Sequence, residues 1–339
     1  MTILKSNIPA KAKCLPRGVY PPCITLFKPT ARQEIDTDAC YAHYSNLIRG
    51  GVAGLVVQGT NGEAVLLSPE EKIELTRTAR KAAADLDLPD YPIVAGISGQ
   101  STNETFKLAE DAAEAGANFA LLLPPSFWPK AATNDVLRDF YREVADESPI
   151  PVVIYNYPGA TNGVDLSSAL LAELAEHPNI VGVKLTCGNA GKVTHLSELF
   201  SPEQFSVYAG QVDWLLPCLI GGGVGCITGM GNIFPRAVSK VYTLWKQNKI
   251  EEAKRLQGAA SAAEKACREG IALTKYGAWK FVGPKIGFND PATYFPRKPY
   301  KPLSKDRQLW CVDTLQHMAD IEESLPDVVV LKGSATNGV

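Results

Sequence analysis

Short apolar runs alternate with longer amphipathic segments along most of this chain, and this alternation limits the fold more than any other feature. The runs are rich in β-branched side chains and lack regular polar alternation. Such runs are typical of parallel strands that are covered on both faces. They are Val19–Leu26, Gly54–Val57, Ile93–Ile97, Phe119–Leu123, Val152–Tyr155, Ile180–Leu185, Phe205–Ala209 and Gly225–Thr228.

The segments between the runs carry helical patterns. Ser68-Pro69-Glu70-Glu71 is a strong helix start, with Ser68 as N-cap, Pro69 at the first position and Glu71 completing a capping box. Eight strand–helix units favour a closed (β/α)8 TIM barrel of the α/β class. The alternative is a doubly wound open sheet, which predicts a G-x-G-x-x-G turn after the first strand, and the chain has none there.

The pattern becomes entirely helical after the eighth unit. Helices are expected at Ile250–Arg268, Leu273–Val282 and Leu303–Ile321. The sequence therefore predicts a disordered N-terminal arm at 1–17, the barrel at 18–248, a C-terminal helical extension at 249–325 and a tail at 326–339.

Composition excludes several classes of function. The chain has 339 residues, is 45% hydrophobic and carries a formal net charge of −2, so no basic excess points to nucleic acid or an anionic membrane. No apolar run approaches the ~20 residues that span a bilayer. Four histidines show no H-x-H or H-E-x-x-H spacing, so we expect no metal site.

Cysteine usage and the N-terminus bear on location. The eight cysteines form no C-x-x-C pair, which favours buried thiols in a reducing compartment, and we expect a cytoplasmic protein. The alternative is mitochondrial, because the first seventeen residues hold four basic side chains and no acid. Pro9 and Pro16 interrupt any amphipathic helix there.

Polar residues at the carboxyl ends of strands are candidates for catalysis, because active sites of this fold lie at that end of the barrel. Lys184 lies in the apolar run Ile180–Leu185. A charged lysine is costly to bury there, whereas a neutral amine is a nucleophile that forms a Schiff base with a ketone. The alternative is a lysine that reaches solvent or pairs with a carboxylate.

Two other strand ends carry candidate groups. Tyr155 is the first polar side chain after the fifth run, where a phenol can transfer a proton or simply pack at the end of the barrel. The turn Gly59-Thr60-Asn61-Gly62-Glu63 can aim successive main-chain N–H groups at an anion, or it can be only a tight connection to the next helix.

Taken together, these motifs resemble those of the dihydrodipicolinate synthase / N-acetylneuraminate lyase superfamily. The resemblance spans roughly residues 18–302 and rests on four motifs that follow the expected strands in the expected order. They are Gly59-Thr60-Asn61-Gly62-Glu63, Tyr155-Asn156-Tyr157-Pro158, Val181-Gly182-Val183-Lys184, and Gly225-Cys226-Ile227-Thr228 with Asn232.

The resemblance implies roles for individual residues. Lys184 matches the imine-forming lysine, Tyr155 the proton-transferring tyrosine, and Thr60 with Asn61 the pair that holds the substrate carboxylate. Gly210 and Ile227 fall where relatives line the pocket. It also implies a keto acid and an aldehyde as ligands, no metal or other cofactor, and a homotetramer or homodimer.

The chain departs from the family pattern at two places. Phe127 stands where many relatives carry a tyrosine of a proton relay, so the relay must be shortened or pass through Ser126 or water. Ala160 stands where synthases of dihydrodipicolinate carry a carboxylate-binding arginine, which argues against that reaction. Thr161, Asn162 and Thr186 offer hydrogen bonds to a polyol instead.

Within the superfamily, Pro158-Gly159 and the run from Val183 to Gly188 are most like the L-threo-3-deoxy-hexulosonate aldolases of fungi. We therefore expect cleavage of a 2-keto-3-deoxy sugar acid to pyruvate and an aldehyde such as glyceraldehyde. The 4-hydroxy-2-oxoglutarate aldolases, which release glyoxylate, are the next alternative. Dihydrodipicolinate synthesis, a metal-dependent aldolase and a non-catalytic ligand-binding barrel are further alternatives.

Overall fold

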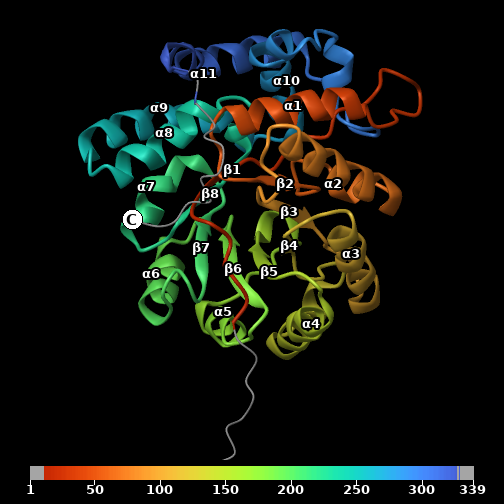
Figure 1. Ribbon diagram of the computed structural model, residues 1–339, viewed down its shortest axis with the longest axis vertical. Coiled ribbons are helices and arrows are strands. Elements are labelled where there is room, and N and C mark those ends of the chain that lie inside the picture. Colours follow the sequence, from red (N-terminus) through yellow and green to blue (C-terminus); the bar gives the residue numbers. More distant parts are fainter. Residues whose placement is uncertain (1–10, 327, 329–339) are drawn as a thin grey trace, which may run out of the picture.

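A computed structural model describes residues 11–326 and 328 and contains a barrel of eight parallel strands (Figure 1). The strands are β1 (Gly18–Tyr20), β2 (Leu55–Val57), β3 (Ile93–Gly96), β4 (Phe119–Leu122), β5 (Val152–Asn156), β6 (Ile180–Leu185), β7 (Ser206–Ala209) and β8 (Gly225–Ile227). They are ordered β1-β8-β7-β6-β5-β4-β3-β2, and a single parallel bridge between Pro22 and Val56 joins the two ends. The predicted (β/α)8 architecture is confirmed.

One helix follows each strand and packs around the outside of the barrel (Figure 1). The predicted capping box is present at α2, where Ser68 and Glu71 exchange hydrogen bonds between side chain and main-chain N–H. The surrounding helices are α1 (Thr37–Arg49), α2 (Pro69–Ala84), α3 (Thr102–Glu114), α4 (Asn134–Glu147), α5 (Ser168–Ala175), α6 (Ala190–Leu199), α7 (Leu215–Ile220) and α8 (Pro235–Lys246).

The first strand is much shorter than the apolar run that predicted it. We expected strand over Val19–Leu26, but β1 ends at Tyr20. Pro21 and Pro22 follow directly and have no main-chain N–H to donate to a neighbouring strand. The rest of the run is buried loop, which leads the chain from the barrel to α1.

Three further helices form the C-terminal extension, α9 (Ile250–Arg268), α10 (Ile271–Phe281) and α11 (Lys305–Ser324). α9 packs against α8, and α10 and α11 lie together beside it at the top of Figure 1. α8 ends and α9 begins on either side of the boundary predicted at residue 248, and the division of the chain into a barrel and an extension stays a prediction.

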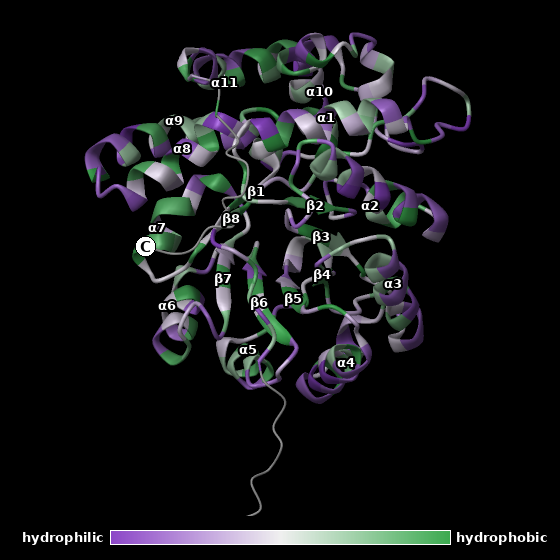
Figure 2. Cartoon of the chain, viewed as in Figure 1, coloured by the Kyte–Doolittle hydropathy of each residue, from purple (hydrophilic) through white to green (hydrophobic). Residues whose placement is uncertain are grey.

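The apolar core has two parts because each strand faces both ways. One cluster fills the inside of the barrel and includes Tyr20, Tyr155, Tyr208 and Ile227. A larger cluster lies between the strands and the surrounding helices. In Figure 2 the strands are mostly hydrophobic, whereas the helices carry both hydrophobic and hydrophilic residues. This is the two-sided burial that the uninterrupted apolar runs predicted.

The end of the predicted arm is ordered, which differs from the disorder expected for residues 1–17. Residues 11–17 cross the amino-terminal end of the barrel (Figure 1), and Leu15 is fully buried there. The main-chain N–H of Ala12 donates to the carbonyl of Pro178, and the hydroxyls of Tyr20 and Tyr208 donate to the carbonyl of Pro16. The remaining arm residues, 1–10, and nearly all of the predicted tail lie outside the described residues.

Candidate active site

Lys184 and Tyr155 lie side by side on neighbouring strands. They are direct partners in the register of β5 and β6, which shifts between Val152 and Val153. Lys184 is only 2% exposed, and its Nζ lies 4.0 Å from the centre of the Tyr155 ring. No side-chain acceptor or carbonyl in the described residues bonds this amine. Strand pairing thus places a buried, unpaired amine against a phenol ring, near the carboxyl end of the barrel.

The phenol is linked to the turn after β2. The hydroxyl oxygens of Tyr155 and Thr60 are 3.3 Å apart, although the two residues lie 95 positions apart in the sequence. The ring of Tyr157 stacks on that of Tyr155 with a centroid distance of 5.8 Å. Burial, with a smaller effect of Tyr155, raises the pKa of Tyr157. The candidate residues Lys184, Tyr155 and Thr60 therefore form one connected group.

In the turn Gly59–Glu63, two carbonyls accept hydrogen bonds from later residues of the turn, whereas two N–H groups have no acceptor in the described chain. The carbonyls of Gly59 and Thr60 accept from the N–H groups of Gly62 and Glu63 at 3.0 and 3.1 Å. The N–H groups of Thr60 and Asn61 donate to no acceptor in residues 11–326. Two adjacent free donors beside a threonine hydroxyl are suited to bind a carboxylate.

The ends of β6, β7 and β8 supply the other candidates. Thr186 follows Lys184 by two residues, and its Oγ1 is buried without a hydrogen-bond partner in the described chain. A Cβ on Gly210 would lie 2.0 Å from that Oγ1, so only glycine fits at this position. Ile227 is completely buried inside the barrel. A buried hydroxyl without a partner is costly and is often explained by a ligand or water that is not shown.

The loops after β4 and β5 differ from expectation. The Thr161 hydroxyl is buried and donates within its own loop, to the carbonyls of Tyr157 or Val164, and Asn162 donates to the carbonyl of Ser126 at 2.9 Å. Both side chains therefore already make hydrogen bonds within the chain, and the expectation that they bind a polyol stays a prediction. Ser126 is held through its N–H by Gln100. Phe127 is 70% exposed.

One buried acid near this group was missed by the sequence reasoning. Glu264 of α9 accepts hydrogen bonds from the Thr228 hydroxyl, at the end of β8, and from the N–H of Val212, after β7. Burial, helped by the charge of Asp213, raises the pKa of Glu264 to about 8. The sequence did carry a sign of this buried acid. Glu264 lies on the apolar face of α9, together with Ala260, Ala263 and Ala266.

Two further properties limit the chemistry. Among residues 11–326 and 328, no three His, Cys, Asp or Glu side chains are grouped so that they could hold a metal ion. In the same part of the chain, no helix is both long and apolar enough to cross a membrane. At the carboxyl end of the barrel the chain itself supplies a buried amine, a phenol and free main-chain N–H groups.

Comparison with known proteins places these residues in a family context. The sequence profile of the dihydrodipicolinate synthetase family matches residues 15–318. A Coccidioides immitis protein, provisionally named a mitochondrial 4-hydroxy-2-oxoglutarate aldolase, is 42% identical over 91% of this chain and 97% of its own length. An L-threo-3-deoxy-hexylosonate aldolase of Hypocrea jecorina is 35% identical over 92% of this chain and 98% of its own length.

Solved structures agree with these sequence matches. A dihydrodipicolinate synthase family protein from Coccidioides immitis superposes with a TM-score of 0.86 at 39% identity, covering 93% of this chain and 99% of its own. A prophage protein of that family from E. coli K12, solved in complex with pyruvate, superposes with a TM-score of 0.78 at 26% identity. That match covers 89% of this chain and 98% of the other.

Proposed function

Because this chain belongs to the dihydrodipicolinate synthetase family, we propose that it is a class I aldolase that cleaves a 4-hydroxy-2-oxo acid to pyruvate and an aldehyde. The observation that carries the proposal is the buried Lys184 amine, which has no hydrogen-bond partner in the described chain and lies 4.0 Å from the centre of the Tyr155 ring. The imine is the electron sink in this chemistry, so the reaction needs no metal.

The first half of the reaction forms the imine. The free amine of Lys184 attacks the C2 ketone, and the C1 carboxylate binds the N–H groups and side chains of Thr60 and Asn61. The resulting carbinolamine loses its hydroxyl as water after Tyr155 delivers a proton to it. The contact between the hydroxyls of Tyr155 and Thr60 keeps the phenol oriented for this transfer.

The second half breaks the carbon–carbon bond. Tyr155 removes the proton from the C4 hydroxyl, the C3–C4 electron pair moves into the protonated imine, and the aldehyde leaves. The enamine then takes up a proton at C3, and water hydrolyses the imine to release pyruvate and the Lys184 amine. Every proton that leaves one group is taken by another, and no oxidant or cofactor is consumed.

A 2-keto-3-deoxy sugar acid is the substrate that we propose first. Ala160 is exposed and uncharged, so it gives a second carboxylate no cation with which to pair. The buried Thr186 hydroxyl, which has no partner in the described chain, is available to a hydroxyl of a polyol. The name of the Hypocrea jecorina relative agrees with such a substrate.

A second candidate is 4-hydroxy-2-oxoglutarate, which releases glyoxylate. The relative at 42% identity carries that name. Arg268, at the end of α9, is also close enough to Tyr157 for its charge to oppose the rise in the pKa of that phenol. This guanidinium pairs with Asp213 at 2.6 Å, and its charge near the stacked tyrosines suits it to bind a second carboxylate as well.

The test combines imine trapping with a choice of aldehydes. Borohydride added with pyruvate, in excess EDTA, should reduce an adduct that peptide mass spectrometry assigns to Lys184. At fixed pyruvate, kcat/KM for glyceraldehyde should exceed that for aspartate semialdehyde by at least about 10²-fold. Glyoxylate in the same assay separates the two candidates. An adduct on another lysine contradicts the mechanism, and equal rates with aspartate semialdehyde contradict the interpretation of Ala160.

We also propose that the protein is an oligomer. The loop after β4 exposes an aromatic pair, Phe127 at 70% and Trp128 at 75%, whose rings meet edge to face at 5.1 Å. Large exposed aromatic side chains commonly mark contacts between proteins. Sedimentation velocity should give a dimer or tetramer, and replacing both residues by serine should shift it toward the monomer.

The compartment that we propose is the mitochondrion. The names of two relatives, from Coccidioides immitis and Emericella nidulans, include that location, which favours the alternative over the cytoplasm. The basic N-terminal residues agree with an import sequence. Fractionation of cells that express the full chain tests the proposal, and N-terminal sequencing of the recovered protein shows whether residues are removed.

A further inference from the structure

The turn that carries Thr60 and Asn61 is fixed by contacts that its last two residues, Gly62 and Glu63, make with other parts of the chain. The carbonyl of Gly62 accepts from the Thr25 hydroxyl at 2.7 Å. Glu63 has a φ of 56°, in the left-handed region that non-glycine residues seldom adopt. Such a conformation persists only where the surroundings hold it, so the contacts of Glu63 determine the shape of the turn.

The Glu63 carboxylate is held by two groups from the C-terminal extension. One oxygen accepts from Lys275 Nζ of α10 at 2.8 Å, and the other accepts from the N–H of Arg297 at 2.8 Å. The Lys275 and Glu63 side chains are 0% and 3% exposed, so the ion pair is fully buried. Lys275 also donates to the carbonyl of Phe295 at 2.8 Å.

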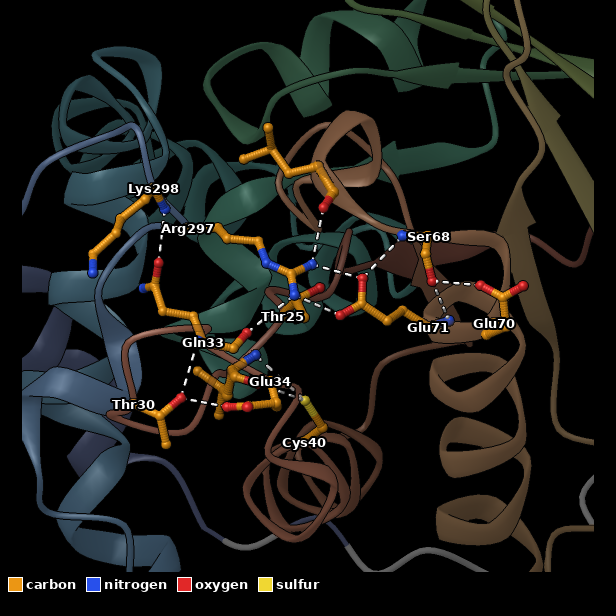
Figure 3. A network of polar contacts seen from close by, with 12 residues as sticks. Thr25, Thr30, Gln33, Glu34, Cys40, Ser68, Glu70, Glu71, Arg297 and Lys298 are labelled. Atoms are coloured by element: carbon orange, nitrogen blue, oxygen red, sulfur yellow. Dashed lines mark hydrogen bonds and ion pairs between the residues drawn. The ribbon is translucent and has the colours of Figure 1, made fainter.

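The side chain of Arg297 holds the other end of the same loop. Its guanidinium bonds both carboxylate oxygens of Glu71, in the first turn of α2, and the carbonyls of Leu66 and Gln33. Figure 3 shows Arg297 reaching Glu71 beside the N-cap residue Ser68. The extension therefore forms hydrogen bonds with the β2–α2 connection near its start, at Glu63, and near its end, at Glu71.

Stability alone does not explain a buried ion pair at this place. Removing two charges from water is expensive, and well-packed apolar residues are often as stable as a buried pair. Burial lowers the pKa of Lys275, and the Glu63 carboxylate offsets part of this effect. What the pair provides and apolar residues do not is a single defined position for the carboxylate, and hence for the turn that precedes it.

We propose that Lys275 is a positioning residue for the active site: through its ion pair with Glu63 it fixes the turn that presents the Thr60 hydroxyl and the N–H groups of Thr60 and Asn61 to the carboxylate of the 2-oxo acid. This inference rests on the proposed aldolase function. The C-terminal extension is then part of the binding apparatus, and not only a cover on the outside of the barrel.

The test measures pyruvate binding separately from stability. Imine formation is trapped with borohydride over a range of pyruvate concentrations in the wild-type protein and in Lys275→Met. The half-saturating pyruvate concentration should rise at least about tenfold in the variant, the effect of losing one good polar contact to the carboxylate. The rate at saturating pyruvate should stay within about threefold, because Lys184 and Tyr155 are unchanged.

The matched control is Arg236→Met, which removes the ion pair of Arg236 with Glu322 between α8 and α11. This variant should lower the melting temperature and leave the half-saturating concentration unchanged. If Lys275→Met behaves like the control, Lys275 has only a structural role and the inference is wrong. If Lys275→Met does not fold, Glu63→Gln replaces it, because it keeps the size of the side chain and removes the charge.

Glu63→Gln should raise the half-saturating concentration about threefold, the effect of weakening one charged hydrogen bond to a neutral one. An unchanged value would overturn the inference. The wild-type measurement separates this inference from the proposed function. A wild-type adduct on Lys184 with no effect of either variant contradicts only the role of Lys275, whereas the absence of any wild-type adduct contradicts the aldolase proposal itself.

Discussion

The two ends of the barrel interior each contain buried tyrosines, but the hydroxyls at the two ends have different hydrogen-bond partners. At the amino-terminal end, the rings of Tyr20 and Tyr208 meet edge to face at 5.8 Å, and both hydroxyls donate to main-chain carbonyls of the N-terminal segment. At the carboxyl end, Thr60 offers the one hydrogen-bond partner of the Tyr155 hydroxyl among the described residues, at 3.3 Å, and the Lys184 amine has none there.

This difference suggests that polar groups at one end of the barrel stabilise the fold, whereas those at the other end bind substrate. Buried polar groups that are fully bonded make the interior rigid and specific, and those without partners weaken it unless a ligand or water completes them. At the amino-terminal end, both tyrosine hydroxyls have acceptors within the chain. The carboxyl end leaves Lys184, Thr186 and two N–H groups of the turn after β2 available, which is the arrangement expected where a substrate binds.

The largest effect should come from removing the amine. Lys184→Ala should abolish turnover and the borohydride adduct, because it removes the amine that we propose forms the imine. The fold should be retained, since the amine has no hydrogen-bond partner among the residues that the structure describes. Aldolase assay, intact-protein mass spectrometry and circular dichroism check the three expectations. A trapped adduct in this variant would place the reactive lysine elsewhere.

The next largest effect should come from the tyrosine at the carboxyl end. Tyr155→Phe should lower kcat by roughly 10²–10⁴-fold, the usual contribution of a positioned acid–base group. Its free energy of unfolding should change by less than about 1 kcal/mol, because the hydroxyl makes only one long contact. Steady-state kinetics and urea unfolding measure both. A nearly normal kcat would mean that another group transfers the proton.

Glu264 sharpens the comparison, because it is a buried acid near the functional end that has only partial hydrogen bonding. Its pKa is about 8 in the folded protein and near 4.5 when unfolded, so folding favours the protonated form. Its contribution to stability is complete below pH 4.5 and is lost as pH rises through about 8. Relative to wild type, Glu264→Gln should therefore gain stability with rising pH, on the order of a few kcal/mol.

Urea unfolding of both proteins at mildly acidic, neutral and alkaline pH measures this difference. All other ionisable groups are shared, so the difference between the two curves isolates Glu264. Parallel curves would mean that Glu264 ionises in the folded protein as it does in the unfolded chain.

The smallest effect should come from the tyrosine at the amino-terminal end. Tyr208→Phe removes a hydroxyl that donates to the carbonyls of Leu15 and Pro16 at 2.7 and 2.8 Å. The free energy of unfolding should fall by about 1–2 kcal/mol, the cost of leaving a buried partner unbonded. Because the change lies at the opposite end from Lys184, kcat should be unchanged. A loss of activity without a loss of stability would contradict the assignment of stability to the amino-terminal end and catalysis to the carboxyl end.

Much of the architecture could be predicted from local patterns. The eight apolar runs, the capping box at Ser68 and the helices after residue 249 are each set by neighbouring residues, and all of them occur in the structure. Prediction was wrong where a local rule was overridden. Pro21 and Pro22 ended β1 early, and residues 11–17 are held by contacts with β6 and β7, which lie far from them in the chain.

The sequence by itself determined that a lysine must lie in a buried strand and that a glycine-bracketed turn must follow β2, because residue type and periodicity encode burial locally. Only the tertiary structure decided which groups meet there. The register of β5 and β6 pairs Tyr155 with Lys184, and folding of the extension brings Lys275 to Glu63 across 212 positions. Such contacts depend on how the barrel closes and how α10 packs, and neither can be predicted from a local sequence pattern.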